Sequence, residues 1–80
     1  MQDLVNKPEH YNQGGIECID AIEASLSEEA FQGYLKGNAI KYLWRWNQKN
    51  TDPLLQLQDL RKASWYLSRL ATQVERNAEE

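Results

Sequence analysis

The sequence predicts a small all-α domain of three helices with an ordered N-terminal loop, assembled into an oligomer. Apolar residues recur at helical spacing over three stretches, and no stretch of useful length alternates as a strand does. The 80 residues, 41 % of them hydrophobic and 26 % charged, are enough for one domain with a small core. Because such a core is marginal, we expect a second copy or a ligand to add stability.

The N-terminal loop is expected to cover residues 1–15, where Pro8, Asn12, Gly14 and Gly15 interrupt any helical period. Gly14-Gly15 precedes a helix start, so it either makes a tight turn or offers backbone amides to an anion. The helical domain then spans residues 16–75, and residues 76–80 form a frayed polar tail. Its first helix is expected over residues 16–26, from the spacing of its apolar residues.

The second helix is expected from Glu28 to Asn47. Ser27 is a suitable N-cap, and carboxylates in the first turn interact favourably with the helix dipole. Gly33 and Gly37 lie in its interior, where each glycine costs about 1 kcal/mol relative to alanine. Two explanations are open: a break or kink near Gly37, or the close approach of another backbone.

The third helix is expected from Pro53 to Glu75, because Asp52-Pro53 combines a capping residue with proline at the first helical position. Apolar and small residues then recur at spacings of three and four. This seam comprises Leu57, Leu60, Ser64, Leu67, Ala71 and Val74. A narrow seam of this kind packs two helices side by side. Its partner is either a second copy, which we favour, or the first two helices of the same chain.

Composition excludes several classes of protein. The net charge of −3 and the pI of about 5.1 argue against a general nucleic-acid binder. Cys18 is the single cysteine, so no intrachain disulfide or cysteine-based zinc site can form, and we expect it to be a small buried hydrophobe. No apolar run approaches the roughly 20 residues of a membrane span, and the N-terminus lacks the pattern of a signal peptide. A reducing cytoplasm fits these features.

Asn38, Lys41 and Arg45 lie along one face of the second helix. One amide and two cations are suited to an anion such as phosphate, since arginine binds it bidentately and lysine acts as a point charge. The alternative is a solvated helix face. Large aromatic residues follow nearby, and we expect most to lie in the core or at a subunit interface, with one able to face a ligand. They are Tyr42, Trp44, Trp46, Trp65 and Tyr66.

Other polar residues each allow more than one interpretation. Glu17 and Asp20 could hold Mg²⁺ through water, or form part of a solvated acidic face. On the third helix, Asp59 and Lys62 either form an exposed ion pair or complete a polar pocket with the stripe of the second helix. His10, the one histidine, could carry a proton, contact phosphate or simply hold down the loop.

The sequence resembles a small phage family, DUF3310, over about residues 5–70. Four motifs carry the resemblance, in this order along the chain: Pro8-x-His10-Tyr11, Gly15-Ile16-Glu17-Cys18-Ile19-Asp20, Gly37-Asn38-x-x-Lys41-Tyr42-x-x-Arg45 and Asp59-Leu60-x-Lys62-Ala63-x-Trp65-Tyr66-Leu67. Members are often described as phage nucleotide kinases. The resemblance implies a nucleoside monophosphate kinase that acts on deoxynucleotides without a Walker A loop, and this chain has no such loop.

The resemblance also implies a site. Its candidate residues are His10, Tyr11, Asn38, Lys41, Tyr42, Arg45 and Lys62. Of these, His10, Lys41 and Arg45 are the candidates for a catalytic role. ATP would be the phosphate donor, accompanied by Mg²⁺, and the protein would work in the host cytoplasm. Two alternatives remain open: a protein that sequesters a nucleotide without turnover, and a protein that binds and inhibits a host protein.

Overall fold

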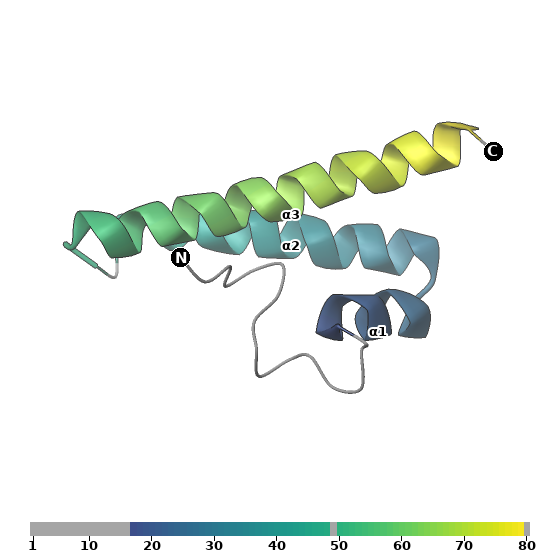
Figure 1. The fold of residues 1–80 in the computed structure, drawn as a ribbon, viewed down its shortest axis with the longest axis horizontal. Helices are drawn as coiled ribbons and strands as arrows, with labels where there is room; N and C mark the ends of the chain where they lie inside the picture. The colour runs from purple at the N-terminus through teal and green to yellow at the C-terminus, as the bar shows by residue number, and fades with distance from the viewer. Residues whose placement is uncertain (1–16, 49, 80) are drawn as a thin grey trace. The chain divides into compact units, whose positions relative to one another are not determined.

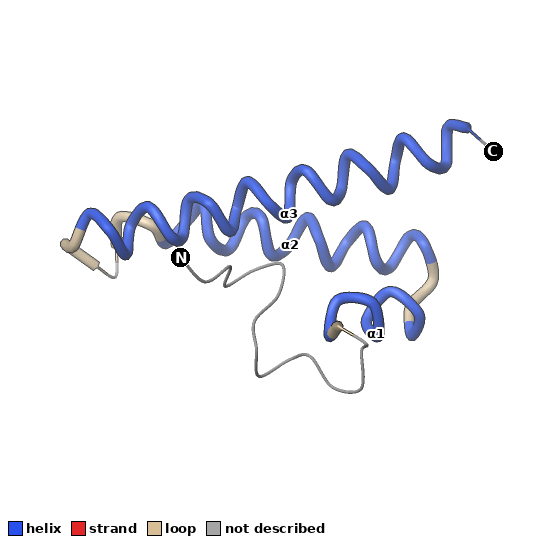
Figure 2. The backbone as a smooth tube through the Cα atoms, viewed as in Figure 1, coloured by secondary structure: helices blue, strands red, loops and turns tan. Residues whose placement is uncertain are grey.

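A computed structural model describes residues 17–48 and 50–79 of the chain. They form three helices, α1 (Cys18–Ser25), α2 (Glu28–Arg45) and α3 (Pro53–Glu79), and this described part holds no strand (Figure 2). The prediction of a small all-α domain is therefore confirmed. The expected N-terminal loop, residues 1–15, lies outside the described residues, and the division into loop, helical domain and tail stays a prediction.

The chain divides into two compact units, Met1–Phe31 and Gln32–Glu80. The described part of the first unit contains α1 and the first turn of α2. In α1 the half-buried residues are Ile19, Ile22 and Glu23. Cys18 is exposed, so the expectation of a buried cysteine is wrong. The apolar neighbours that suggested burial project from α1 in other directions, because successive helical residues differ by about 100°.

Helix α2 begins where its capping residue predicts. The Ala30 N–H donates to Ser27 Oγ over 3.1 Å, and the Phe31 N–H donates to the Ser27 carbonyl over 2.9 Å. The helix then continues without interruption through Gly33 and Gly37 to Arg45. A Cβ added at either glycine would meet nothing within 4 Å among the described residues. Within the described part of the chain, neither a helix break nor the close approach of another backbone accounts for these glycines.

The second unit is a helical hairpin, in which α2 and α3 lie side by side and run in opposite directions (Figure 1). Its turn ends at Asp52, whose Oδ1 accepts the Leu54 N–H over 2.9 Å. With Pro53 as its first residue, α3 starts as predicted. It ends at Glu79, four residues beyond the expected end.

The interior of the hairpin is formed by one face of α3 and the facing residues of α2. Leu35 is fully buried on α2, and Asp59, Ala63 and Gln73 are buried on α3. These α3 positions differ from the seam predicted from the sequence, which we call the α3 seam. In the α3 seam Leu57, Leu67 and Val74 are exposed, and Leu60 is half-buried. Within the hairpin, the row that faces α2 is therefore not the α3 seam, and the partner of the seam stays a prediction. The residues that face α2 form a second row beside the seam.

Candidate functional site

Three cationic side chains surround the ring of Tyr42. Lys41 and Arg45 come from α2, with Lys41 Nζ at 4.6 Å and Arg45 Cζ at 4.8 Å from the ring centroid. Lys62 comes from α3, with its Nζ at 5.2 Å from the same centroid. All three distances fall within the range of a cation–π interaction. We call Lys41, Tyr42, Arg45 and Lys62 the tyrosine–cation cluster.

The ring at the centre of the cluster is held by other aromatic side chains. Tyr42 stacks on Tyr66 of α3, with centroids 5.9 Å apart and planes 7° from parallel. Tyr66 in turn meets Tyr34 edge-on at 6.2 Å and Trp65 edge-on at 5.1 Å. Such pairs each contribute about 0.5–1.5 kcal/mol beyond the area they bury. The cluster is thus built on a packed aromatic layer between the two helices of the hairpin.

Asp59 positions one of the three cations. Arg45 Nε lies 3.3 Å from Asp59 Oδ2, and Arg45 Nη2 lies 3.4 Å from Oδ1, so the pair is bidentate. The Asp59 side chain is 6 % exposed, whereas that of Arg45 is 36 % exposed. The guanidinium therefore places its Nε and Nη2 atoms on a buried carboxylate, and the N–H groups of Nη1 are not used by this pair. The exposed ion pair of Asp59 with Lys62, one of our two expectations, does not form.

The net charge of this region is positive. Among residues 17–48 and 50–79, Arg45 is the one member of the cluster with a carboxylate partner, and Asp59 supplies a single negative charge. Lys41 and Arg45 are four residues apart on one helix, where like charges repel mildly. A phosphate between them would replace repulsion with charge-assisted hydrogen bonds, which are the stronger class. An anion is therefore the ligand that this arrangement fits best.

Asn38 lies one turn before Tyr42 on α2 and is half-buried. Its Nδ2 donates to the Tyr34 carbonyl over 2.9 Å. Because this bond uses the amide nitrogen, the side-chain oxygen is left as an acceptor for a sugar hydroxyl or a base amino group. The structure places Asn38 beside the cluster with its orientation fixed by its own helix.

The other predicted residues are distributed differently. His10 and Tyr11 lie outside the described residues. Glu17 and Asp20 are near one another at the start of α1, where the Asp20 N–H donates to the Glu17 carbonyl over 3.0 Å. In the described part of the chain, no group of three or more histidine, cysteine, aspartate or glutamate residues could hold a metal ion.

The list of candidate site residues omitted two contributors, although Asp59 was one of the residues expected to complete a polar pocket with the stripe of the second helix. Tyr66 supports the ring of Tyr42, and Asp59 orients Arg45. A signal for both was present, because Asp59, Lys62 and Tyr66 share one face of the third helix. What the sequence lacked was the register between α2 and α3, which decides which residues of the two faces meet.

The fold and the site together define a class: a small all-α protein whose helical hairpin gathers three cations around a stacked tyrosine. The chain belongs to DUF3310, a family described as proteins of unknown function, which matches residues 5–68. All residues of the tyrosine–cation cluster, with Asn38, Asp59 and Tyr66, fall inside this range.

Two phage proteins are similar to the chain. It is 38 % identical over 63 residues to the Gene 1.7 protein of Enterobacteria phage T3, covering 78 % of this chain and 38 % of that protein. It is 41 % identical over 63 residues to the Nucleotide kinase gp1.7 of Escherichia phage T7, covering 78 % of this chain and 32 % of that protein. The chain thus spans about a third of the length of these relatives.

No solved structure matches the chain. None of the helices in the described ranges combines the length and the apolar character that crossing a membrane requires.

Proposed function

We propose that the protein binds a nucleotide, with its phosphate held by the tyrosine–cation cluster. The observation that carries this proposal is the convergence of Lys41, Arg45 and Lys62 on one ring from two different helices. If Lys41 and Arg45 belonged only to a solvated helix face, they would not share a ring with a cation from α3. The name of the T7 relative supports a nucleotide as the source of the phosphate.

Each residue has a chemical role in this proposal. Arg45, oriented by Asp59, offers the N–H groups of its Nη1 to two phosphate oxygens, and Lys41 and Lys62 neutralise the remaining charge. Asn38 offers its oxygen to the sugar or base. By resemblance to the family, His10 and Tyr11 are further candidates for contact with the nucleotide.

We further propose that the bound nucleotide is a deoxynucleoside monophosphate that accepts a phosphoryl group from ATP. An oxygen of its phosphate attacks the γ-phosphorus, the bond to the β–γ bridging oxygen breaks, and ADP leaves. Catalysis of this transfer is mostly positioning and neutralisation of charge. Mg²⁺ would enter with ATP, and Glu17 and Asp20 are the candidates for contact with its water shell. This would take place in the host cytoplasm.

The same geometry fits a second function, a protein that holds a nucleotide without turnover. The cluster supplies cations for one phosphate group, whereas phosphoryl transfer needs donor and acceptor together. A coupled assay of ADP production, with each deoxynucleoside monophosphate and ATP, separates the two functions. Turnover supports the kinase, and tight binding without turnover supports sequestration.

Isothermal titration calorimetry with the four deoxynucleoside monophosphates and ATP tests the binding itself. The double variant Lys41→Ala/Arg45→Ala should bind at least ~100-fold more weakly, because two charge-assisted contacts of about 1.5–3 kcal/mol each are lost. The matched control is Lys36→Ala/Arg61→Ala, which removes the same two charges at exposed positions outside the cluster. Equal affinity of the double variant and the control would contradict the proposal. Binding by neither variant nor the wild type would favour the host-protein alternative.

A further inference from the structure

The α3 seam is an apolar row that the described part of the chain leaves uncovered. Leu57 is 41 % exposed, Leu67 is 61 % exposed and Val74 is 52 % exposed. Ser64 and Ala71 are exposed as well, and Leu60 is half-buried. Single exposed leucines are ordinary, but a continuous apolar row along one helix marks an interaction surface.

The spacing within the row indicates the shape of the partner. Its members alternate at intervals of three and four residues, which is a seven-residue repeat with a period of 3.5. An α-helix has 3.6 residues per turn, so a row with a period of 3.5 drifts slowly around a straight helix. Two helices that coil around one another keep such rows in contact along their length. The pattern of the α3 seam therefore indicates that its partner is another helix.

The sizes of the side chains indicate which helix that is. When two copies of α3 pair antiparallel, Leu57 meets Val74, Leu60 meets Ala71, and Ser64 meets Leu67. Every layer then contains one leucine and one different residue, and the small residues face large ones, as a filled core requires.

Parallel pairing in register would instead place Ser64 on Ser64 and Ala71 on Ala71, which leaves two hollow layers. We propose that two copies of this chain associate antiparallel through the α3 seam.

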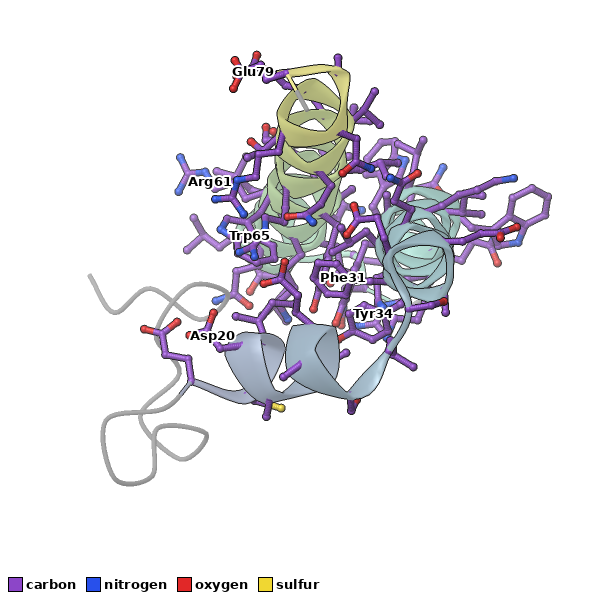
Figure 3. The ribbon with its side chains drawn as sticks, turned by 90° about the vertical axis from the view of Figure 1, so that its right-hand side faces the viewer. Asp20, Phe31, Tyr34, Arg61, Trp65 and Glu79 are labelled. Carbon is purple, nitrogen blue, oxygen red and sulfur yellow. The ribbon has the colours of Figure 1, made fainter. Side chains whose placement is uncertain are left out.

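The edge of the seam that points away from α2 is charged. Arg61 and Glu75 each follow a seam residue directly and lie on this edge of α3. Figure 3 shows Arg61 extending from α3 on the side away from α2. In the antiparallel pair these side chains lie at the rim of the interface, where they stay in contact with water.

This interface leaves the tyrosine–cation cluster open. Asp59, Lys62 and Tyr66 face α2 or its flank, on a different side of α3 from the seam. The proposal therefore stands independently of the proposed nucleotide binding, and the two can be tested separately.

Sedimentation velocity of the full chain over a range of concentrations tests the association. The wild type should approach twice the 9.3 kDa of one chain, and Leu67→Lys should return it to a single chain. The matched control is Leu43→Lys, at an α2 leucine that is 60 % exposed and so equals Leu67 in exposure. Val74→Lys with Ile40→Lys as its control, at 52 % and 50 % exposed, repeats the comparison at a second layer. Circular dichroism confirms that each variant is helical.

A wild type that remains monomeric at every concentration would overturn the proposal. So would an association that the α2 variants abolish and the seam variants leave intact.

Disulfide formation tests the direction of pairing. In a Cys18→Ser background, copies carrying Leu57→Cys are mixed with copies carrying Val74→Cys, and cross-linked products are identified by mass. Antiparallel pairing predicts the mixed product, because residues 57 and 74 of one chain are about 25 Å apart and only the two copies together bring them within disulfide range. A product joining two Leu57→Cys copies would show parallel pairing and overturn the antiparallel arrangement.

Discussion

The ring of Tyr42 brings together side chains that would otherwise repel one another. Each cation gains about 0.5–1 kcal/mol from the ring face at a partly exposed position, and the ring itself is fixed by its stack on Tyr66. Because the ring holds the three charges in place before a ligand arrives, a phosphate group would pay little ordering entropy on binding.

A substitution at Lys62 tests whether the binding site is shared by α2 and α3 or is confined to α2. Lys62→Ala should weaken nucleotide binding about tenfold, because one charge-assisted contact is lost. Arg61→Ala, its neighbour on the far side of α3, should leave the affinity unchanged. Calorimetry on both variants measures this difference, and equal effects would mean that Lys62 acts only through net charge.

The pair of Arg45 and Asp59 contributes to both stability and binding. Asp59→Asn keeps the shape of the side chain but removes the charge that holds the guanidinium. We expect a loss of about 1–3 kcal/mol in the free energy of unfolding, measured by urea denaturation, since a nearly buried acceptor of a charged donor is altered. Asp20→Asn, at an exposed position of α1, is the control and should change stability by less than about 0.5 kcal/mol.

At the scale of the element, helix α2 contains two glycines at positions where no feature of the described residues requires a glycine. The helix is continuous through both, and the space where each Cβ would stand is open. Gly33→Ala and Gly37→Ala should each therefore raise the free energy of unfolding by about 0.5–1 kcal/mol, because alanine has less backbone entropy to lose. Thermal and urea unfolding measure the gain. A loss of stability at either position would show that something outside the described residues packs against it.

Helix α3 carries two adjacent rows with different uses. One row, which includes Asp59, Ala63 and Gln73, is covered within the hairpin, and the other row is the α3 seam. A helix of this length can serve two partners at once because its faces are separated by the 100° turn between residues.

At the scale of the whole molecule, ligand binding and association should be separable. Leu67→Lys should lose association but keep the nucleotide affinity of the wild type, and Lys41→Ala/Arg45→Ala should lose affinity but keep association. Sedimentation and calorimetry on the same preparations measure both properties. A seam variant that also loses nucleotide binding would mean that the site is completed by the second copy.

The proposed association would also make stability depend on protein concentration. The melting temperature of the wild type should rise with concentration, because mass action favours a folded dimer over unfolded chains. The melting temperature of Leu67→Lys should be independent of concentration. Differential scanning calorimetry at several concentrations measures this difference.

Much of the architecture followed from local signals. Ser27 and Asp52-Pro53 predicted the starts of two helices to the residue, because capping uses atoms within one turn. The ends were less well placed: α3 continues to Glu79, since polar residues with good helix propensity carry no stop signal. For the candidate site, Lys41 and Arg45 were found from their spacing on one helix, whereas the roles of Asp59 and Tyr66 depended on contacts between helices.

The amino-acid pattern alone determined three helices, the stripe of Asn38, Lys41 and Arg45, and the heptad row of α3, because each depends on the period of a single helix. The tertiary structure decided which row of α3 faces α2. That choice depends on how side chains interlock across two helices, which no single-helix period contains. It placed Lys62 and Tyr66 at Tyr42, buried Asp59 beneath Arg45, and left Leu57, Leu67 and Val74 of the heptad row exposed.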